Sequence, residues 1–80
     1  MARVLLFGPL RDIAGWRERE VEGVDSLSSL RAYIAREDAA LGEALQGPGV
    51  QVALDQLLVR GDRLIGPRSE VAFLPPMSGG

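Results

Sequence analysis

The sequence has no cysteine and no histidine among its 80 residues. These absences exclude disulfides, thiolate nucleophiles, the common zinc ligand sets and the usual base at neutral pH. Catalysis by the chain alone would depend on its 11 acidic residues, which are spread along the sequence and mostly adjoin charged or turn residues. We interpret most of them as solvated surface and expect the chain not to act as a catalyst by itself.

Lysine is also missing, so every basic side chain is an arginine. The 9 basic and 11 acidic residues give a net charge of -2, which offers no attraction for a polyanion. The arginines form no block of neighbours, and aromatic residues that could stack on bases make up only 5% of the chain. Nucleic acid is therefore not the expected ligand.

Long apolar runs are absent as well. No run approaches the ~20 residues that a bilayer-spanning helix needs, and the N-terminal segment lacks the apolar region of a signal peptide. We expect a cytoplasmic protein with no membrane partner. The 46% hydrophobic and 25% charged residues are typical of a globular domain, and 80 residues provide one core but no deep active-site cleft.

The first half of the chain predicts two strands and two helices. The apolar run 4–7 indicates a central strand covered on both faces, and Pro9 suits the start of a helix of one or two turns. Alternating charges over residues 17–24 favour an outer strand. Asp25 and Ser26 then suit a helix N-cap. An apolar stripe at helical spacing marks the main helix: Leu27, Leu30 and Ile34.

The second half predicts a short helix capped by Asp38, a hairpin over residues 50–59 and a last strand over residues 71–74. Because proline supplies no donor to a sheet, the last strand ends at Pro75. This order favours an α+β fold, the ubiquitin-like β-grasp, in which a mixed sheet packs on one main helix. A ferredoxin-like fold would need a second long helix near residues 60–70, where glycine and proline stand.

We expect the β-grasp domain to cover residues 1–74 and an extended C-terminal tail to cover residues 75–80. The tail ends on Gly79 and Gly80, which lack a Cβ and let a partner's backbone and a reactive phosphate come close. A terminal carboxylate, with a pKa of about 3.3–3.7, is ionised at neutral pH and becomes an acyl donor only after activation, as by adenylation. Nothing else in the chain suggests an ATP site, so a partner is expected to carry out this chemistry. The alternative is a disordered end without function.

Residues 7–15 read Phe-Gly-Pro-Leu-Arg-Asp-Ile-Ala-Gly, and residues 70–80 contain Val-Ala-Phe-x-Pro-Pro-x-x-Gly-Gly. In both stretches, and over its whole length, the chain resembles the MoaD family, the small subunit of molybdopterin synthase. Asp55 stands where the family commonly has Asn, and Arg68-Ser69 replaces the Gly-Asp often seen before the last strand. Asp and Asn both suit turns, so we expect little change in function.

The resemblance implies a sulfur carrier that binds no cofactor itself. A ubiquitin-activating-enzyme-like adenylyltransferase (MoeB-like) would use ATP to form an acyl-adenylate on Gly80, and a sulfur relay would convert it to a thiocarboxylate. The tail would then enter the active site of the large synthase subunit (MoaE-like). There it would donate sulfur to cyclic pyranopterin monophosphate and so build the dithiolene of molybdopterin.

The same resemblance assigns roles to residues of the tail and of the domain. Gly80 is the adenylate and thiocarboxylate acceptor, and the two prolines hold the arm extended because proline fixes φ. The residues expected to thread into the partners are Pro75, Pro76, Met77, Ser78 and Gly79. The residues expected to form an apolar partner-binding patch beside the tail are Phe7, Leu58 and Leu74, although Phe7 and Leu58 could instead be core.

Three other functions remain open at this point. The carrier could serve thiamine or transfer-RNA thiolation, although such carriers usually lack the Phe-x-Pro-Pro segment. The chain could be a ubiquitin-like protein modifier joined to target lysines through Gly80. It could also be a purely structural subunit, for which the terminal glycines would be dispensable.

Overall fold

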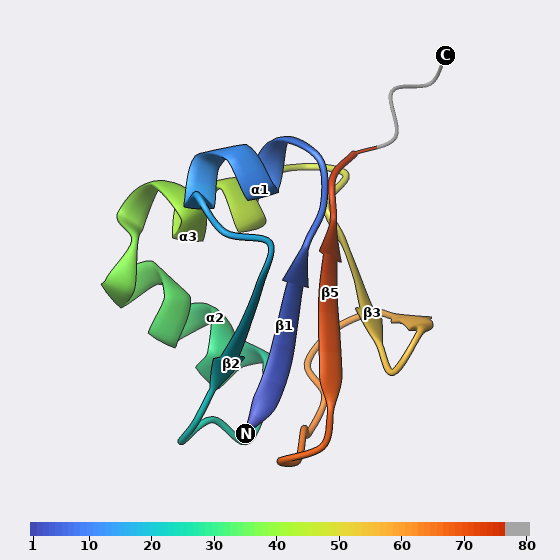
Figure 1. Ribbon diagram of the computed structural model, residues 1–80. Coiled ribbons are helices and arrows are strands. Elements are labelled where there is room, and N and C mark those ends of the chain that lie inside the picture. Colours follow the sequence, from blue (N-terminus) through green and yellow to red (C-terminus); the bar gives the residue numbers. More distant parts are fainter. Residues whose placement is uncertain (77–80) are drawn as a thin grey trace.

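The computed structural model describes residues 1–76, in which five strands form one mixed sheet that packs against helices (Figure 1). In chain order the elements are β1 (Ala2–Leu6), α1 (Pro9–Ala14), β2 (Glu18–Val21), α2 (Leu27–Glu37), α3 (Ala39–Leu45), β3 (Gln51–Leu54), β4 (Leu57–Val59) and β5 (Glu70–Leu74). The strand order across the sheet is β2-β1-β5-β3-β4. β5 runs parallel to β1, and the other neighbouring pairs are antiparallel. The order of elements is the predicted one, and the last strand lies at the centre of the sheet.

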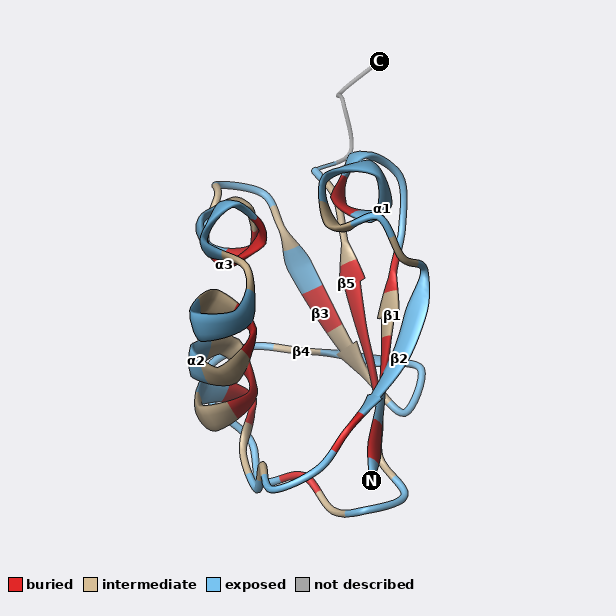
Figure 2. Ribbon diagram, turned by 60° about the vertical axis from the view of Figure 1, so that its left-hand side comes forward, coloured by how far each residue is buried: buried red, intermediate tan, exposed pale blue. Residues whose placement is uncertain are grey.

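The core lies between the sheet and helices α2 and α3. Successive side chains of a strand point to opposite faces, so β1 and β5 each direct alternate residues to the helices. These residues are Val4, Leu6, Val71 and Phe73, all 0% exposed. From the other side α2 buries the predicted stripe of Leu27, Leu30 and Ile34. Figure 2 shows these buried segments of sheet and helix facing each other.

Local signals in the sequence set the helix starts. α1 begins at Pro9, as predicted. The predicted cap Ser26 forms a reciprocal pair with Ser29, because each hydroxyl accepts a hydrogen bond of 3.0 Å from the other residue's backbone N–H. At the start of α3 the Asp38 carboxylate accepts a hydrogen bond of 3.1 Å from Leu41 N–H, which confirms that cap as well.

One face of the sheet is left uncovered by the described helices, and here a prediction from the apolar run 4–7 is wrong. α2 and α3 cover the opposite face, and α1 lies across the end of the sheet (Figure 2). β1 is a central strand, but Leu5 is only half-buried and Phe7 is 45% exposed. A continuous apolar run does not distinguish burial on two faces from burial on one face beside an apolar surface.

Gly42 permits the close packing of α3 on α2. A Cβ at this position would stand 2.6 Å from both Cα and Cβ of Ala35. At a solvent-exposed position inside a helix, a Gly→Ala substitution raises the free energy of unfolding by about 1 kcal/mol. In this packed contact we expect Gly42→Ala to destabilise by about 1–3 kcal/mol in urea unfolding, because backbone must move. Gly66→Ala is the control, since nothing lies within 4 Å of its Cβ position. Equal stability of the two variants would contradict the packing.

The β3–β4 hairpin turns through two residues with left-handed backbone, Asp55 at φ 50° and Gln56 at φ 71°. Such a turn favours Asn, Asp or Gly and disfavours glutamine. Asp55 also bonds β5, since its N–H donates to Glu70 O at 2.8 Å and its Oδ1 accepts from Glu70 N–H at 2.9 Å. The MoaD family commonly has asparagine at position 55, and the side-chain oxygen of asparagine could accept the same hydrogen bond from Glu70 N–H. We therefore still expect aspartate at this position to have little effect.

Replacing Gln56 by glycine should therefore stabilise the protein. Relief of the left-handed conformation outweighs the entropy that glycine adds to the unfolded chain, and we expect a gain of about 0.5–1 kcal/mol in the free energy of unfolding. Gln46→Gly is the matched control, because Gln46 has φ -92° and gains no relief. It should lose stability in the same urea titration. A loss in both variants would show that the Gln56 turn is not strained.

Candidate functional site

The root of the tail is the end of the central strand. β5 ends at Leu74, and Pro75 and Pro76 leave the sheet at the end where α1 lies (Figure 1). Two glycines make room for them. A Cβ at Gly8 would come within 3.1 Å of Pro75 Cγ, and a Cβ at Gly49 within 2.8 Å of Pro76 Cβ. Both glycines have positive φ, +57° and +84°, which other residues rarely adopt.

These two glycines were missed in the sequence, although both stand next to a proline in a predicted turn or loop. Gly8 belongs to the β1–α1 turn and Gly49 to the α3–β3 loop, so their contact with the prolines joins three distant parts of the chain. The other tail positions fall outside the described residues: Met77, Ser78, Gly79 and Gly80. Their assigned roles stay predictions.

The uncovered sheet face carries the three residues predicted to bind partners. The strand register places Leu5, Ala72, Ala53 and Leu58 in one row across this face. Phe7 and Leu74 follow two residues after Leu5 and Ala72, at the end where the tail leaves. We call this face of the sheet the open face and define it by the residues that the register places on it, of which Ala72 is itself buried: Leu5, Phe7, Ala53, Leu58, Ala72 and Leu74.

The exposed fractions of Phe7 and Leu58 show whether these residues belong to the surface or to the core. Phe7 is 45% exposed and Leu58 is 62% exposed, so the alternative that they belong to the core is wrong. Leu74 is half-buried, whereas its neighbour Phe73 points inward and is fully buried. An apolar surface of this kind is typical of a docking site. Its use by a partner stays a prediction.

Charged groups gather at the end of the open face away from the tail. The Arg3 guanidinium lies 2.9 Å from Glu70 Oε1 and 3.6 Å from Glu18 Oε2. Such half-exposed pairs add little stability. They do confine the apolar part of the face to the region beside the tail.

Residues 1–76 hold no group of three acidic side chains close enough to bind a metal ion. In the same part of the chain no helix combines the length and apolar character needed to cross a membrane. The candidate site thus has two parts. The central strand β5 leads into the tail, and the apolar open face lies beside the point where the tail begins.

The profile of the ThiS family matches residues 4–80. The chain belongs to the ThiS family. It is 32% identical, over 81 residues and the full length of both chains, to the molybdopterin synthase sulfur carrier subunit of Escherichia coli. The resemblance to the MoaD family inferred from the tail and the 7–15 stretch is thereby confirmed.

Two solved structures share the fold. SAMP1 from Haloferax volcanii superposes with a TM-score of 0.80, covering 99% of this chain and 98% of that one. The small archaeal modifier protein 1 from Methanosarcina acetivorans has a TM-score of 0.85, with 99% and 95% covered. Both are 22% identical to this ThiS-family chain, so they bear on fold alone. The predicted ubiquitin-like β-grasp is confirmed.

Proposed function

We propose that this ThiS-family chain is the sulfur-carrier subunit of molybdopterin synthase. The observation that carries the proposal is its full-length 32% identity with the Escherichia coli sulfur carrier subunit. The geometry supports it, because the central strand runs into the Pro75-Pro76 arm directly beside an apolar face. The cytoplasmic location expected from the sequence stays a prediction.

The chemistry begins with activation of Gly80. One carboxylate oxygen attacks the α-phosphorus of ATP, and pyrophosphate leaves, which gives an acyl-adenylate. A sulfur donor at the oxidation level of hydrosulfide then attacks the carbonyl carbon, and AMP leaves with its oxygen. The product is a thiocarboxylate, formed without net oxidation or reduction. An adenylyltransferase supplies the ATP site and the catalytic groups, as expected from the sequence.

The second stage transfers the sulfur. In the large synthase subunit the thiocarboxylate sulfur attacks a carbon of cyclic pyranopterin monophosphate, and the C–O bond at that carbon breaks so that the oxygen substituent leaves as the C–S bond forms. Water then cleaves the bond between the Gly80 carbonyl and sulfur, which restores the carboxylate. The narrow tail lets the reacting carbonyl reach a buried site, while the open face fixes the domain outside it.

A sulfur carrier for thiamine or transfer-RNA thiolation is the second candidate, because the ThiS family match covers nearly the whole chain. Co-purification of the tagged chain from its own cells distinguishes the two. We expect the large subunit of molybdopterin synthase among the bound proteins. Recovery of only a thiazole synthase or a transfer-RNA thiolase would contradict the assignment.

A charge on the open face should weaken binding to the large subunit. Leu58→Asp places a carboxylate where we expect an apolar contact, and loss of a contact worth about 2 kcal/mol corresponds to roughly 30-fold weaker binding. Leu64→Asp is the matched control, since Leu64 is 85% exposed but lies outside the open face. Titration calorimetry should show an unchanged Kd for the control. Equal Kd values for both variants would exclude the open face as the interface.

A further inference from the structure

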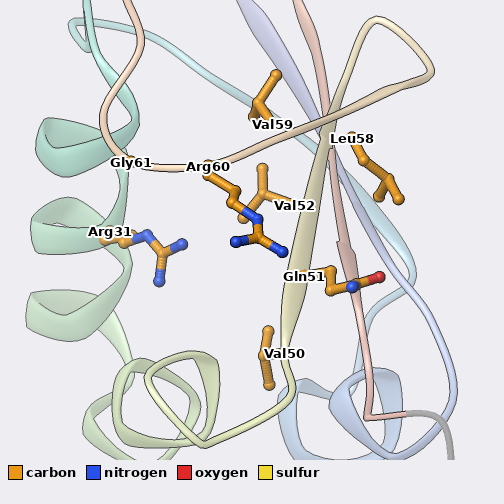
Figure 3. A pocket seen from close by; sticks show the side chains of 8 residues that line it. All are labelled: Arg31, Val50, Gln51, Val52, Leu58, Val59, Arg60 and Gly61. Atoms are coloured by element: carbon orange, nitrogen blue, oxygen red, sulfur yellow. The ribbon is translucent and has the colours of Figure 1, made fainter.

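A cleft of about 380 Å³ lies between helix α2 and the β3–β4 edge of the sheet. Arg31 from α2 and Arg60, just after β4, both line it, and Figure 3 shows their side chains extending into the space between α2 and β3. Its apolar walls are Val50, Val52, Leu58 and Val59. Among residues 1–76, no acidic side chain lines the cleft.

The cleft exists because β4 is shorter than β3. β4 pairs only with residues 52–54, so Val50 and Gln51 have no β4 partner. After Val59 the chain turns away at Gly61, whose φ of +73° suits glycine. The turn leaves Arg60 beside the uncovered end of β3.

The two arginines differ in how firmly they are held. Arg31 is half-buried, donates from Nη1 to Leu45 O at 3.2 Å, and places its guanidinium carbon 5.5 Å from the centre of the Phe73 ring. Arg60 is exposed. Within residues 1–76 neither lies within 4.0 Å of a carboxylate oxygen, since the ion pairs there involve Arg3.

The carboxylate of Asp62, next to the cleft, already accepts hydrogen bonds from neighbouring residues. Asp62 accepts hydrogen bonds from Ser28 N–H at 2.9 Å, from Ser28 Oγ at 2.8 Å and from Arg63 N–H at 3.0 Å. The hydrogen bonds from Ser28 lower the pKa of this carboxyl below its usual range, so it stays ionised and bound to the start of α2. Asp62 keeps its negative charge but lies outside the lining, which itself carries the two guanidinium groups, so the cleft is a local positive site on a chain of net charge -2.

We propose that the cleft between Arg31 and Arg60 binds a carboxylate carried by an acidic loop of a partner protein. Guanidinium groups bind carboxylates through charge-assisted, often bidentate hydrogen bonds. The valine walls fit the aliphatic stem of a glutamate. Leu58 lines the cleft and also belongs to the open face, so one partner can cover the face and reach around β4 into the cleft.

The test uses the full-length, unloaded chain, labelled with ¹⁵N, and the peptide acetyl-Val-Glu-Val-amide as the probe. We expect saturable amide shifts at Gln51, Val59, Arg60 and Gly61, with a Kd on the order of millimolar. The same peptide with glutamine in place of glutamate should produce no saturable shift. Equal binding of both peptides, or no binding of either, would overturn the inference.

Two variants and a second anion sharpen the result. Arg60→Gln should weaken peptide binding about tenfold, and Arg68→Gln, an exposed arginine outside the cleft, should leave the Kd unchanged. Inorganic phosphate binding more tightly than the peptide would overturn the assignment to a carboxylate. Because the probe requires no sulfur loading, failure here leaves the sulfur-carrier function intact, and failure of that function leaves this binding intact.

Discussion

A chain that lacks Gly79 and Gly80 is expected to fold normally and to transfer no sulfur. The last strand ends at Leu74, so the core and the sheet described above remain complete. Removing two residues shortens the greatest reach of the arm by about 7 Å. Because a misplacement of about 1 Å can already cost 10²-fold, we expect sulfur transfer in the reconstituted synthase to fall by at least ~10³-fold.

Gly80→Ala is the control for length. It keeps the reach of the tail and adds one methyl group, so it should retain partial activity and the same free energy of unfolding. Both chains are compared by urea unfolding and by the rate of dithiolene formation. A truncated chain that supports the full rate would favour the purely structural role.

Phe73→Ala should cost about 3–5 kcal/mol of stability, the largest effect expected for a single substitution in the core. Phe73 is 0% exposed, and its β5 backbone pairs with Leu6 of β1 and Val52 of β3. An 80-residue domain has a total stability of about 4–12 kcal/mol, so this loss removes much of it. We expect a large fraction of the variant to be unfolded at 37 °C.

Phe7→Ala is the matched control, because it makes the same substitution on the open face. Phe7 is 45% exposed, and we expect a loss below about 1 kcal/mol. Circular dichroism of both variants in a urea series gives the comparison. Similar losses would contradict the assignment of Phe73 to the core and Phe7 to the surface.

Elements with a local signal were predicted from the sequence. Ser26 and Asp38 cap helices through contacts three residues away, and the stripe of Leu27, Leu30 and Ile34 follows the helical period. The hairpin predicted over residues 50–59 is likewise present, and it turns at Asp55-Gln56. Alternation on a strand also predicted that Leu74 lies on the face opposite the buried Phe73. The use of that face by a partner stays a prediction.

Features that join distant segments were not predicted. The seat of the two prolines depends on Gly8 and Gly49, which approach the tail only after the sheet and α3 have packed. The cleft needs Arg31 from a helix and Arg60 from the end of a hairpin, 29 positions apart in the sequence. The uncovered face of β1 is also a tertiary property, because its apolar run alone does not show which face the helices occupy.

Intact-mass measurement of the chain, after incubation with ATP, a sulfur source and a partner adenylyltransferase, tests the central claim most directly. The account predicts a mass increase that corresponds to exchange of one oxygen for one sulfur, located at Gly80 by fragmentation and abolished when the terminus is amidated. An unchanged mass under conditions in which the Escherichia coli sulfur carrier subunit is loaded, or sulfur at any other position, would contradict it.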